Sequence, residues 1–249
     1  MRRVKRNFPG LRLFLGLALV LPASVAAGAP EKMAAPVPAA NFFPPGSIDW
    51  KAVLPPPPAP GSVAALGDLE TVLQVQAART PADVAWAKLI EKDNIFADYG
   101  DVLGPWFAEK NLPLLAGLLH QVAADVQQVS RSVKDLYPRR RPPVVDAAVQ
   151  PCVEIPKSNS YPSGHSLRAF VWAAVLGDIF PDQQAALEAR AHRVAWGRIL
   201  GGVHFPSDDA GGRIVAQAVV AALRKNPAYR AAVEQCRAEA APFRLKPAA

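Results

Sequence analysis

The stretch NLPLLAGLLHQVAADVQQVSRSVK, residues 111–134, carries the pattern that decides the fold class. Its apolar side chains recur every three or four residues, at Leu114, Leu115, Leu118, Leu119, Val122, Val126 and Val129. This spacing places them on one face of an α-helix. Pro113 suits the first turn of such a helix, where a backbone N–H has no intrahelical partner. The stretch therefore predicts an amphipathic helix that ends near Lys134.

Six more stretches have helical patterns, and no stretch of useful length alternates in the way that a strand does. They are residues 65–79, 80–92 (opened by Thr80 and Pro81), 164–179, 182–200, 206–225 and 227–240. A chain of 249 residues is long enough for one ordinary domain. We therefore expect an all-α fold, a packed bundle of about seven helices formed by residues 62–249.

The N-terminus has the three parts of a secretory signal peptide, which we place at residues 1–29. A basic start contains Arg2, Arg3, Lys5 and Arg6, and nine apolar residues follow at 13–21 before a run of small residues. A membrane anchor is the weaker alternative, because nine residues rise only about 14 Å and a bilayer core is about 30 Å thick. The other apolar runs, 169–177 and 218–223, are also too short. The sequence predicts a periplasmic or secreted protein without stable membrane insertion.

Residues 30–61 form a proline-rich arm, since ten of the 26 prolines lie between Pro30 and Pro60. Proline runs favour the extended polyproline conformation. Phe42, Phe43, Trp50 and Leu54 are interleaved with the prolines, whereas a pure linker is usually more polar. We expect the arm to pack along the helical domain.

The net charge of +7 does not indicate a nucleic-acid partner. Residues 1–26 contain five basic residues and no acidic one, so the remaining chain has a surplus of only +2. A homodimer formed through apolar helix faces is compatible with the sequence, although nothing specific marks an interface.

Cys152 and Cys236 are the two cysteines of the chain. In an oxidising compartment a single pair favours a disulfide, and two buried free thiols are the alternative. We expect the disulfide.

The segment from Arg139 to Pro162 contains five prolines and predicts a long irregular connection. Connections of this length inside a compact domain are usually functional or disordered. This one lies between unusual motifs. Lys134 and Arg141 precede or open it, and Ser163, Gly164 and His165 follow it.

Ser163 is a good N-cap for the apolar helix that follows, which places Gly164 and His165 at a helix N-terminus. Free N–H groups and the helix dipole favour an anion at such a position. Further along the chain, Asp208 follows His204 by four residues and could accept a hydrogen bond from its ring. A carboxylate behind a histidine prepares a nucleophile or base. Lys134, Arg141 and Arg198 are cations suited to phosphate oxygens.

These residues form three motifs: Lys-x6-Arg-Pro from Lys134, Pro-Ser-Gly-His from Pro162, and Arg-x5-His-x3-Asp from Arg198. In this order they resemble the signature of the phosphatidic acid phosphatase type 2 / vanadium haloperoxidase superfamily. The chain looks most like the bacterial class A non-specific acid phosphatases over residues 40–240. One position departs from the pattern, because Gly197 stands where the family often has serine.

The resemblance implies an α-helical, metal-free acid phosphatase without a cofactor, acting on small phosphomonoesters and releasing inorganic phosphate. His204 would form a phosphohistidine, Asp208 would orient it, and His165 would protonate the leaving alcohol and then activate water. The phosphate oxygens would be held by Lys134, Arg141, Arg198, Ser163 and the Gly164 N–H. The loss of a hydroxyl at Gly197 would affect rate or substrate preference more than activity itself.

Three other functions are compatible with some of these residues. A vanadate-dependent haloperoxidase uses the same kind of cationic pocket, and a non-catalytic phosphate-binding protein could share the fold. A membrane lipid phosphatase would need several apolar spans of about 20 residues, which the sequence lacks. His120 and His192 are interpreted as structural or surface residues, and outside the motifs no cluster has metal-site spacing.

Overall fold

A computed structural model describes residues 42–44 and 46–244, all of which lie within one compact unit of the chain. Their regular structure consists of ten α-helices and two short 3₁₀ helices, Glu109–Asn111 and Pro181–Gln183. No strand occurs among these residues. The expected all-α class is confirmed.

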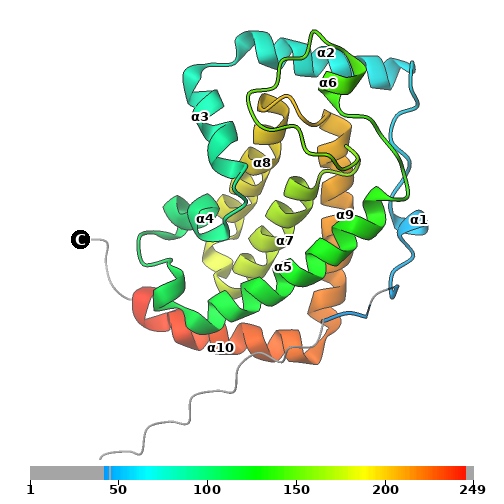
Figure 1. Ribbon diagram of the computed structural model, residues 1–249. Coiled ribbons are helices and arrows are strands. Elements are labelled where there is room, and N and C mark those ends of the chain that lie inside the picture. Colours follow the sequence, from blue (N-terminus) through cyan, green and yellow to red (C-terminus); the bar gives the residue numbers. More distant parts are fainter. Residues whose placement is uncertain (1–41, 45, 245–249) are drawn as a thin grey trace, which may run out of the picture. The chain divides into compact units, whose positions relative to one another are not determined.

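Helix α7 (Gly164–Ile179) is the central helix of the fold (Figure 1). It packs against α5 (Pro113–Lys134), α8 (Gln184–Leu200) and α9 (Pro206–Lys225). Eleven of its sixteen residues are buried, which is expected of a helix that is apolar on nearly every side. The N-terminus of this central helix is the position at which the sequence predicts an anion site.

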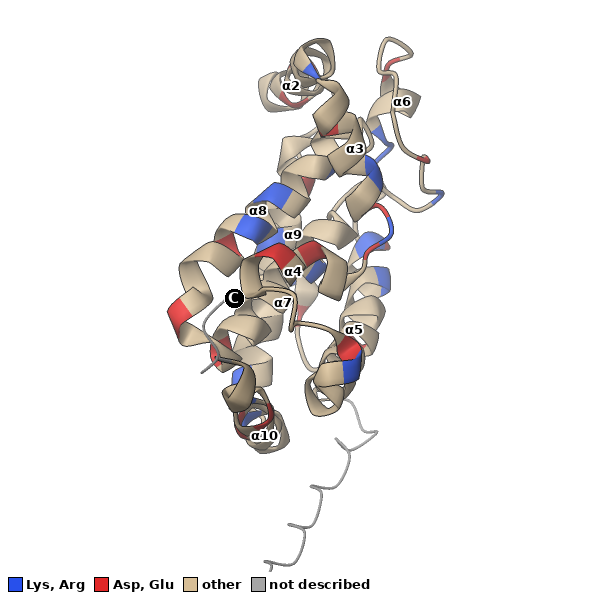
Figure 2. Cartoon of the chain, turned by 90° about the vertical axis from the view of Figure 1, so that its left-hand side faces the viewer, with Lys and Arg blue, Asp and Glu red and all other residues tan. Residues whose placement is uncertain are grey.

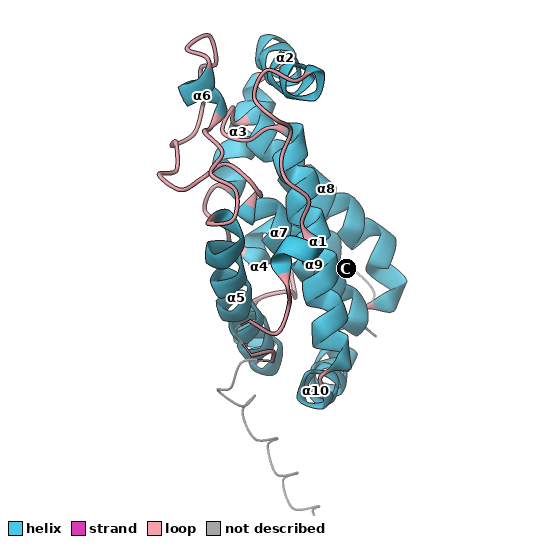
Figure 3. Ribbon diagram, turned by 90° about the vertical axis from the view of Figure 1, so that its right-hand side faces the viewer, coloured by secondary structure: helices cyan, strands magenta, loops and turns pink. Residues whose placement is uncertain are grey.

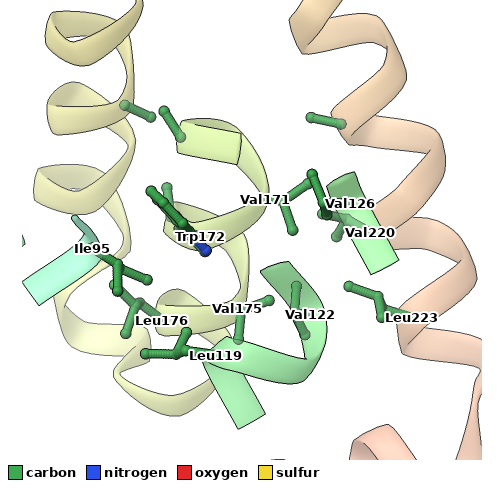
Figure 4. Close-up of a cluster of buried hydrophobic side chains, with 14 of the residues drawn as sticks. Ile95, Leu119, Val122, Val126, Val171, Trp172, Val175, Leu176, Val220 and Leu223 are labelled. Atoms are coloured by element: carbon green, nitrogen blue, oxygen red, sulfur yellow. The ribbon is translucent and has the colours of Figure 1, made fainter. Parts of the chain in front are cut away.

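The hydrophobic core joins side chains from α5, α7 and α9 (Figure 4). Leu119, Val122 and Val126 of α5 face Val171, Val175 and Leu176 of α7, while Val220 and Leu223 come from α9. Burying each such side chain contributes about 1.5–3 kcal/mol to folding. The apolar face that the sequence predicts for residues 111–134 is therefore the face that contacts the core.

The two ends of the bundle differ in character. Helix α10 (Pro227–Arg244) crosses one end, and α2 (Val63–Ala78), α3 (Pro81–Ile90) and α6 (Pro142–Val145) lie at the other (Figure 1). The long connections also gather at this second end (Figure 3). The end that carries the loops is where the three motifs meet.

The expected count of about seven helices is too low. All seven expected helices are present, and three additional ones occur: α1 (Trp50–Val53), α4 (Ile95–Leu103) and α6. Helices α1 and α6 are single turns among prolines. Helix α4 is capped by the side chain of Asn94 and buries Ile95, Tyr99 and Leu103. Its nine residues are too few to give a strong periodic signal.

The described part of residues 30–61 contacts the bundle closely. Phe42 is buried, with its ring centroid 5.7 Å from that of Tyr229 on α10. The Tyr137 hydroxyl donates to the carbonyl of Leu54, which is fully buried. Residues 30–41 and 45, and the expected signal peptide at 1–29, lie outside the described residues.

The expected disulfide does not form in the structure, where Cys152 and Cys236 are free thiols. The two residues belong to opposite ends of the bundle. The Cys152 amide donates to the carbonyl of Gly201 near the end of α8, whereas Cys236 is buried on α10. Helical packing therefore keeps the two sulfurs apart, and spacing along the chain gave no sign of this.

Basic and acidic residues share several helices, among them α5, α8 and α10 (Figure 2), whereas α2 and α4 carry acidic residues only. None of the helices in the described part of the chain is both long and apolar enough to cross a bilayer.

Candidate active site

A cavity of about 260 Å³ lies where α5, the N-terminus of α7 and the connection before it meet. Five predicted site residues line it: Lys134, Arg141, Gly164, His165 and His204. The other three predicted site residues are buried, with at most 1% of their surface exposed: Ser163, Arg198 and Asp208. The fold thus brings together three motifs that are far apart in the sequence.

The ring of His204 is held between a carboxylate and a guanidinium. Its Nδ1 lies 3.1 Å from Oδ2 of Asp208, and its Nε2 lies 3.2 Å from Nη1 of Arg141. Because arginine only donates, Nε2 must be the acceptor and the ring proton must lie on Nδ1. Burial lowers the pKa of His204 to about 3, so the ring is neutral. A neutral imidazole with its lone pair on Nε2 is a nucleophile.

Asp208 accepts hydrogen bonds from several donors besides His204. They are Oγ of Ser160 at 2.6 Å, the amide of Phe205 at 2.9 Å and Nη1 of Arg139 at 2.7 Å. Burial by itself would raise the pKa of Asp208, but the hydrogen bond with His204, followed by the charge of Arg139 and the hydrogen bond from Ser160, outweighs it and lowers that pKa to about 2. The carboxylate is therefore ionised and fixed in place behind the histidine.

Arg139 contacts Asp208 on the side away from His204. It belongs to a run of arginines, a pattern that is typical of a solvated face. Its guanidinium joins Asp208 to Asp68 of α2, at 2.7 Å from each, and lies 4.1 Å from the ring centroid of Phe205. Its neighbour Arg140 is exposed. Nothing in the sequence of the run distinguishes the two, because their difference comes from tertiary contacts.

We expect Arg139→Met to destabilise the protein by about 3 kcal/mol or more, because it leaves two buried carboxylates without their shared cation. Urea unfolding followed by circular dichroism measures this loss. Arg140→Met removes the same charge from an exposed position and is the matched control. Equal stabilities of the two variants would contradict the structural role of Arg139.

His165 has one ring nitrogen with a partner and one without. One nitrogen bonds to the backbone of Glu91 at the end of α3, while Nε2 is buried without a hydrogen-bond partner. Burial, followed by the charges of Arg198 and Arg168, lowers the pKa of His165 well below its usual range. Since buried polar atoms are normally paired, the lone Nε2 points to a ligand contact.

The three predicted cations are crowded into a poorly solvated space. Burial, and then the charge of Arg141, lower the pKa of Lys134 to about 7. Burial, and then the charge of Arg198, lower the pKa of Arg141 to about 10. Nε and Nη1 of Arg198 are buried without partners. A bound anion would offset both the burial and the mutual repulsion of these cations.

The N-terminus of α7 is capped by Ser163. The Ser163 hydroxyl accepts from the Ser166 amide, and the Ser163 amide donates to the Asp208 carbonyl. Gly164 is closely surrounded, because a Cβ there would lie 3.1 Å from Oγ of Ser130 and 3.4 Å from Nη1 of Arg168. The absence of a side chain keeps the backbone accessible to the cavity.

Gly197 has a packing role that explains its departure from the family pattern. A Cβ at this position would lie 3.0 Å from Cδ1 of Ile90 and 3.0 Å from Nε1 of Trp86, both on α3. Glycine therefore allows α3 to approach α8. Helix α3 is followed directly by Glu91, whose backbone contacts His165. The close packing of α3 against α8 therefore also helps to position His165.

Residues 112–231, from the start of α5 to the first turn of α10, match the PAP2 superfamily. A non-specific acid phosphatase of Providencia stuartii is 30% identical over 207 residues, covering 78% of this chain and 81% of that protein. The chain belongs to the PAP2 superfamily. The resemblance inferred from the three motifs is confirmed.

Two more relatives of this PAP2 protein are named as acid phosphatases. An acid phosphatase of Zymomonas mobilis is 29% identical over 198 residues, covering 75% of this chain and 73% of that protein. A non-specific acid phosphatase of Salmonella typhimurium is 27% identical over 203 residues, covering 78% and 80%. The PAP2 match contains all three motifs, whereas Asp68 of α2 and Glu91, the residue after α3, lie outside it.

Proposed function

We propose that this PAP2 protein is an acid phosphatase that hydrolyses phosphomonoesters through a phosphohistidine at His204. One observation carries the proposal: the acceptor Nε2 of His204 and the unpaired Nε2 of His165 belong to residues that line one cavity with Lys134 and Arg141. The activity named for the curated relatives supports it.

In the first step Nε2 of His204 attacks phosphorus, and the bond from phosphorus to the ester oxygen breaks. The leaving oxygen takes a proton from His165. The imidazole ring of the phosphohistidine keeps its proton on Nδ1 and is therefore cationic, so the Asp208 carboxylate stabilises it. In the second step His165 takes a proton from water, which attacks phosphorus and releases inorganic phosphate and neutral His204.

The proposed phosphate contacts are Lys134, Arg141, Arg198, Ser163 and the Gly164 N–H. A phosphoryl transition state is stabilised mainly by positioning and by charge, and the crowded cations can provide both. In this role their lowered pKa values return toward normal when the phosphoryl group arrives.

The test is release of nitrophenol from p-nitrophenyl phosphate by the purified protein in excess EDTA. We expect hydrolysis to persist, and within residues 42–44 and 46–244 no group of three or more His, Cys, Asp or Glu could hold a metal ion. Loss of activity in EDTA, restored by a metal, would contradict the proposal. Phosphate binding without hydrolysis would favour a binding protein, and peroxide-dependent halide oxidation with added vanadate a haloperoxidase.

We expect kcat/KM to be largest at acidic pH. The acid role requires protonated His165, whose lowered pKa means that its protonated fraction falls steadily as pH rises. Lys134, with a pKa of about 7, loses its charge over the same rise, while His204 becomes protonated only below about pH 3. Rates measured from pH 3 to pH 9 test this. A profile that rises toward alkaline pH would contradict the acid role of His165.

The signal-like residues 1–29 lead us to propose export to the periplasm or beyond. Cell fractionation, with N-terminal sequencing of the mature protein, tests this. A chain that keeps Met1 and stays in the cytoplasm would overturn it.

A further inference from the structure

The cavity has more room than a phosphoryl group requires. Its volume of about 260 Å³ approaches that of pockets that hold drug-sized ligands, whereas a phosphoryl group has only a few heavy atoms. Besides the proposed phosphate contacts, the two histidines, Ser130, Pro156 and Ser158, the cavity is lined by Gln127, Arg131 and Arg168. These three polar side chains have no part in the proposed phosphoryl transfer.

Helix geometry separates these three residues from the proposed phosphate site. Gln127, Arg131 and Lys134 share one face of α5, at intervals of four and three residues. At 1.5 Å per residue, Arg131 lies about 5 Å along the helix from Lys134, and Gln127 about 10 Å from it. On α7, Arg168 lies one turn beyond Gly164. The cavity therefore has an inner end at Lys134 and Gly164 and an outer end at Gln127 and Arg131. The guanidinium of Arg168 lies where the two ends meet, because its Nη1 is 3.5 Å from Oε1 of Gln127 and 3.4 Å from the position of a Cβ on Gly164.

Arg168 is fixed in position at the inner border of this outer end. Its Nε forms an ion pair with Asp93, which is on the segment between α3 and α4. Its side chain is 13% exposed, and Nη1 lies 3.5 Å from Oε1 of Gln127. The carboxylate of Asp93 thus holds the guanidinium by one edge, while Nη1 lies beside the cavity wall at Gly164.

The outer end lies on the leaving-group side of the proposed reaction. His165, the proposed proton donor to the leaving oxygen, precedes Arg168 by three residues on the same helix. Side chains spaced in this way lie on one face. An alcohol that receives its proton from His165 would therefore extend past Arg168 and Arg131. Two arginines, Arg131 and Arg168, outnumber the one carboxylate, Asp93, so the net charge near the outer end is positive.

We propose that the outer end is a second anion subsite, which makes the enzyme prefer phosphomonoesters whose alcohol part carries another phosphate or a carboxylate. This proposal rests on the proposed function. Arg168 and Arg131 donate to the second anionic group, while the inner cations bind the phosphoryl group that is transferred. Guanidinium groups suit both phosphate and carboxylate oxygens.

The experiment compares kcat/KM within two matched substrate pairs. Glycerol 3-phosphate and 3-phosphoglycerate differ by a carboxylate, and fructose 6-phosphate and fructose 1,6-bisphosphate differ by a phosphate. The proteins are the full chain, Arg168→Met, Arg168→Lys and Arg131→Met. Arg213→Met, on the exposed side of α9, removes a charge elsewhere and is the control.

We expect the unaltered protein to prefer the more anionic member of at least one pair. Arg168→Met should reduce this preference about tenfold, as loss of a charged hydrogen bond implies. Arg131→Met should reduce it less because Arg131 is exposed, Arg168→Lys should restore part of it, and Arg213→Met should keep it.

Equal kcat/KM values within both pairs, or a preference that survives Arg168→Met, would overturn the subsite. Either result leaves the proposed phosphatase function intact, provided that p-nitrophenyl phosphate is hydrolysed. A chain that hydrolyses none of these esters overturns both proposals. Thermal unfolding of Arg168→Met shows whether loss of the Asp93 pair has altered the fold instead, and in that case Arg168→Lys and Arg131→Met decide.

Discussion

His204→Asn should lower kcat by roughly 10⁴-fold or more, the scale seen when a nucleophile is removed from an enzyme. The reason lies in the geometry of the ring. The ring proton lies on Nδ1 toward Asp208, so the one nitrogen lone pair of the ring is on Nε2, where it accepts a hydrogen bond from Arg141, and asparagine has no nitrogen lone pair to replace it. Quenched-flow labelling with a ³²P substrate measures the loss directly, through an alkali-stable phosphoenzyme that the variant lacks.

The matched control for this variant is His120→Asn, since His120 lies on α5 with a side chain that is 64% exposed. It should keep full activity and full labelling. Because His204 is buried, calorimetric binding of inorganic phosphate checks that the altered site still folds. A His204→Asn protein that still becomes labelled would show that another residue is the nucleophile.

His165→Asn should slow hydrolysis of an alkyl phosphate by about 10²–10⁴-fold, the usual contribution of a general acid. The loss should be smaller with p-nitrophenyl phosphate, because nitrophenolate leaves without a proton. This variant should still form the phosphohistidine, and with the nitrophenyl ester the phosphoenzyme should accumulate because water is no longer activated. Stopped-flow release of nitrophenolate would show this as a burst.

His192→Asn is the control for His165→Asn, since His192 is an exposed residue of α8 whose ring meets Phe170 edge to face. It should keep the leaving-group dependence of the unaltered protein. If His165→Asn slowed both esters equally and gave no burst, His165 would be a positioning residue and not the proton donor.

The helices could be predicted where apolar side chains repeat over many turns. The stretch 111–134 predicts α5 almost to the residue, and Thr80 and Pro81 mark the start of α3 with a capping box that the structure contains. Helix α4 escaped because nine residues give too few repeats, although Asn94 was a usable cap. Single turns such as α1 depend on their tertiary surroundings, which periodicity does not report.

The sequence predicts those residues of the candidate site that belong to the three short motifs. Residues within each motif hold fixed spacings along a helix or turn, so Ser163, His165, His204 and Asp208 could be recognised. Asp68 and Glu91 could not, because they reach the site from segments that only packing brings near. Arg139 lies inside the first motif, but the run of arginines does not distinguish it from the exposed Arg140. The expected disulfide failed for the same reason, since sequence separation says little about distance between helices.

The ion pair between Asp68 and Arg139 defines how small a working fragment of this protein can be. Residues 112–231 contain every proposed catalytic side chain, yet Arg139 within them has one of its two carboxylates on α2. His165 depends on the backbone of Glu91, and Arg168 on Asp93, both before residue 112. The segment that the family shares, residues 112–231, is therefore shorter than the segment that the active site needs. A protein truncated to residues 112–231 would lack Asp68, Glu91 and Asp93, which hold Arg139, His165 and Arg168 in place.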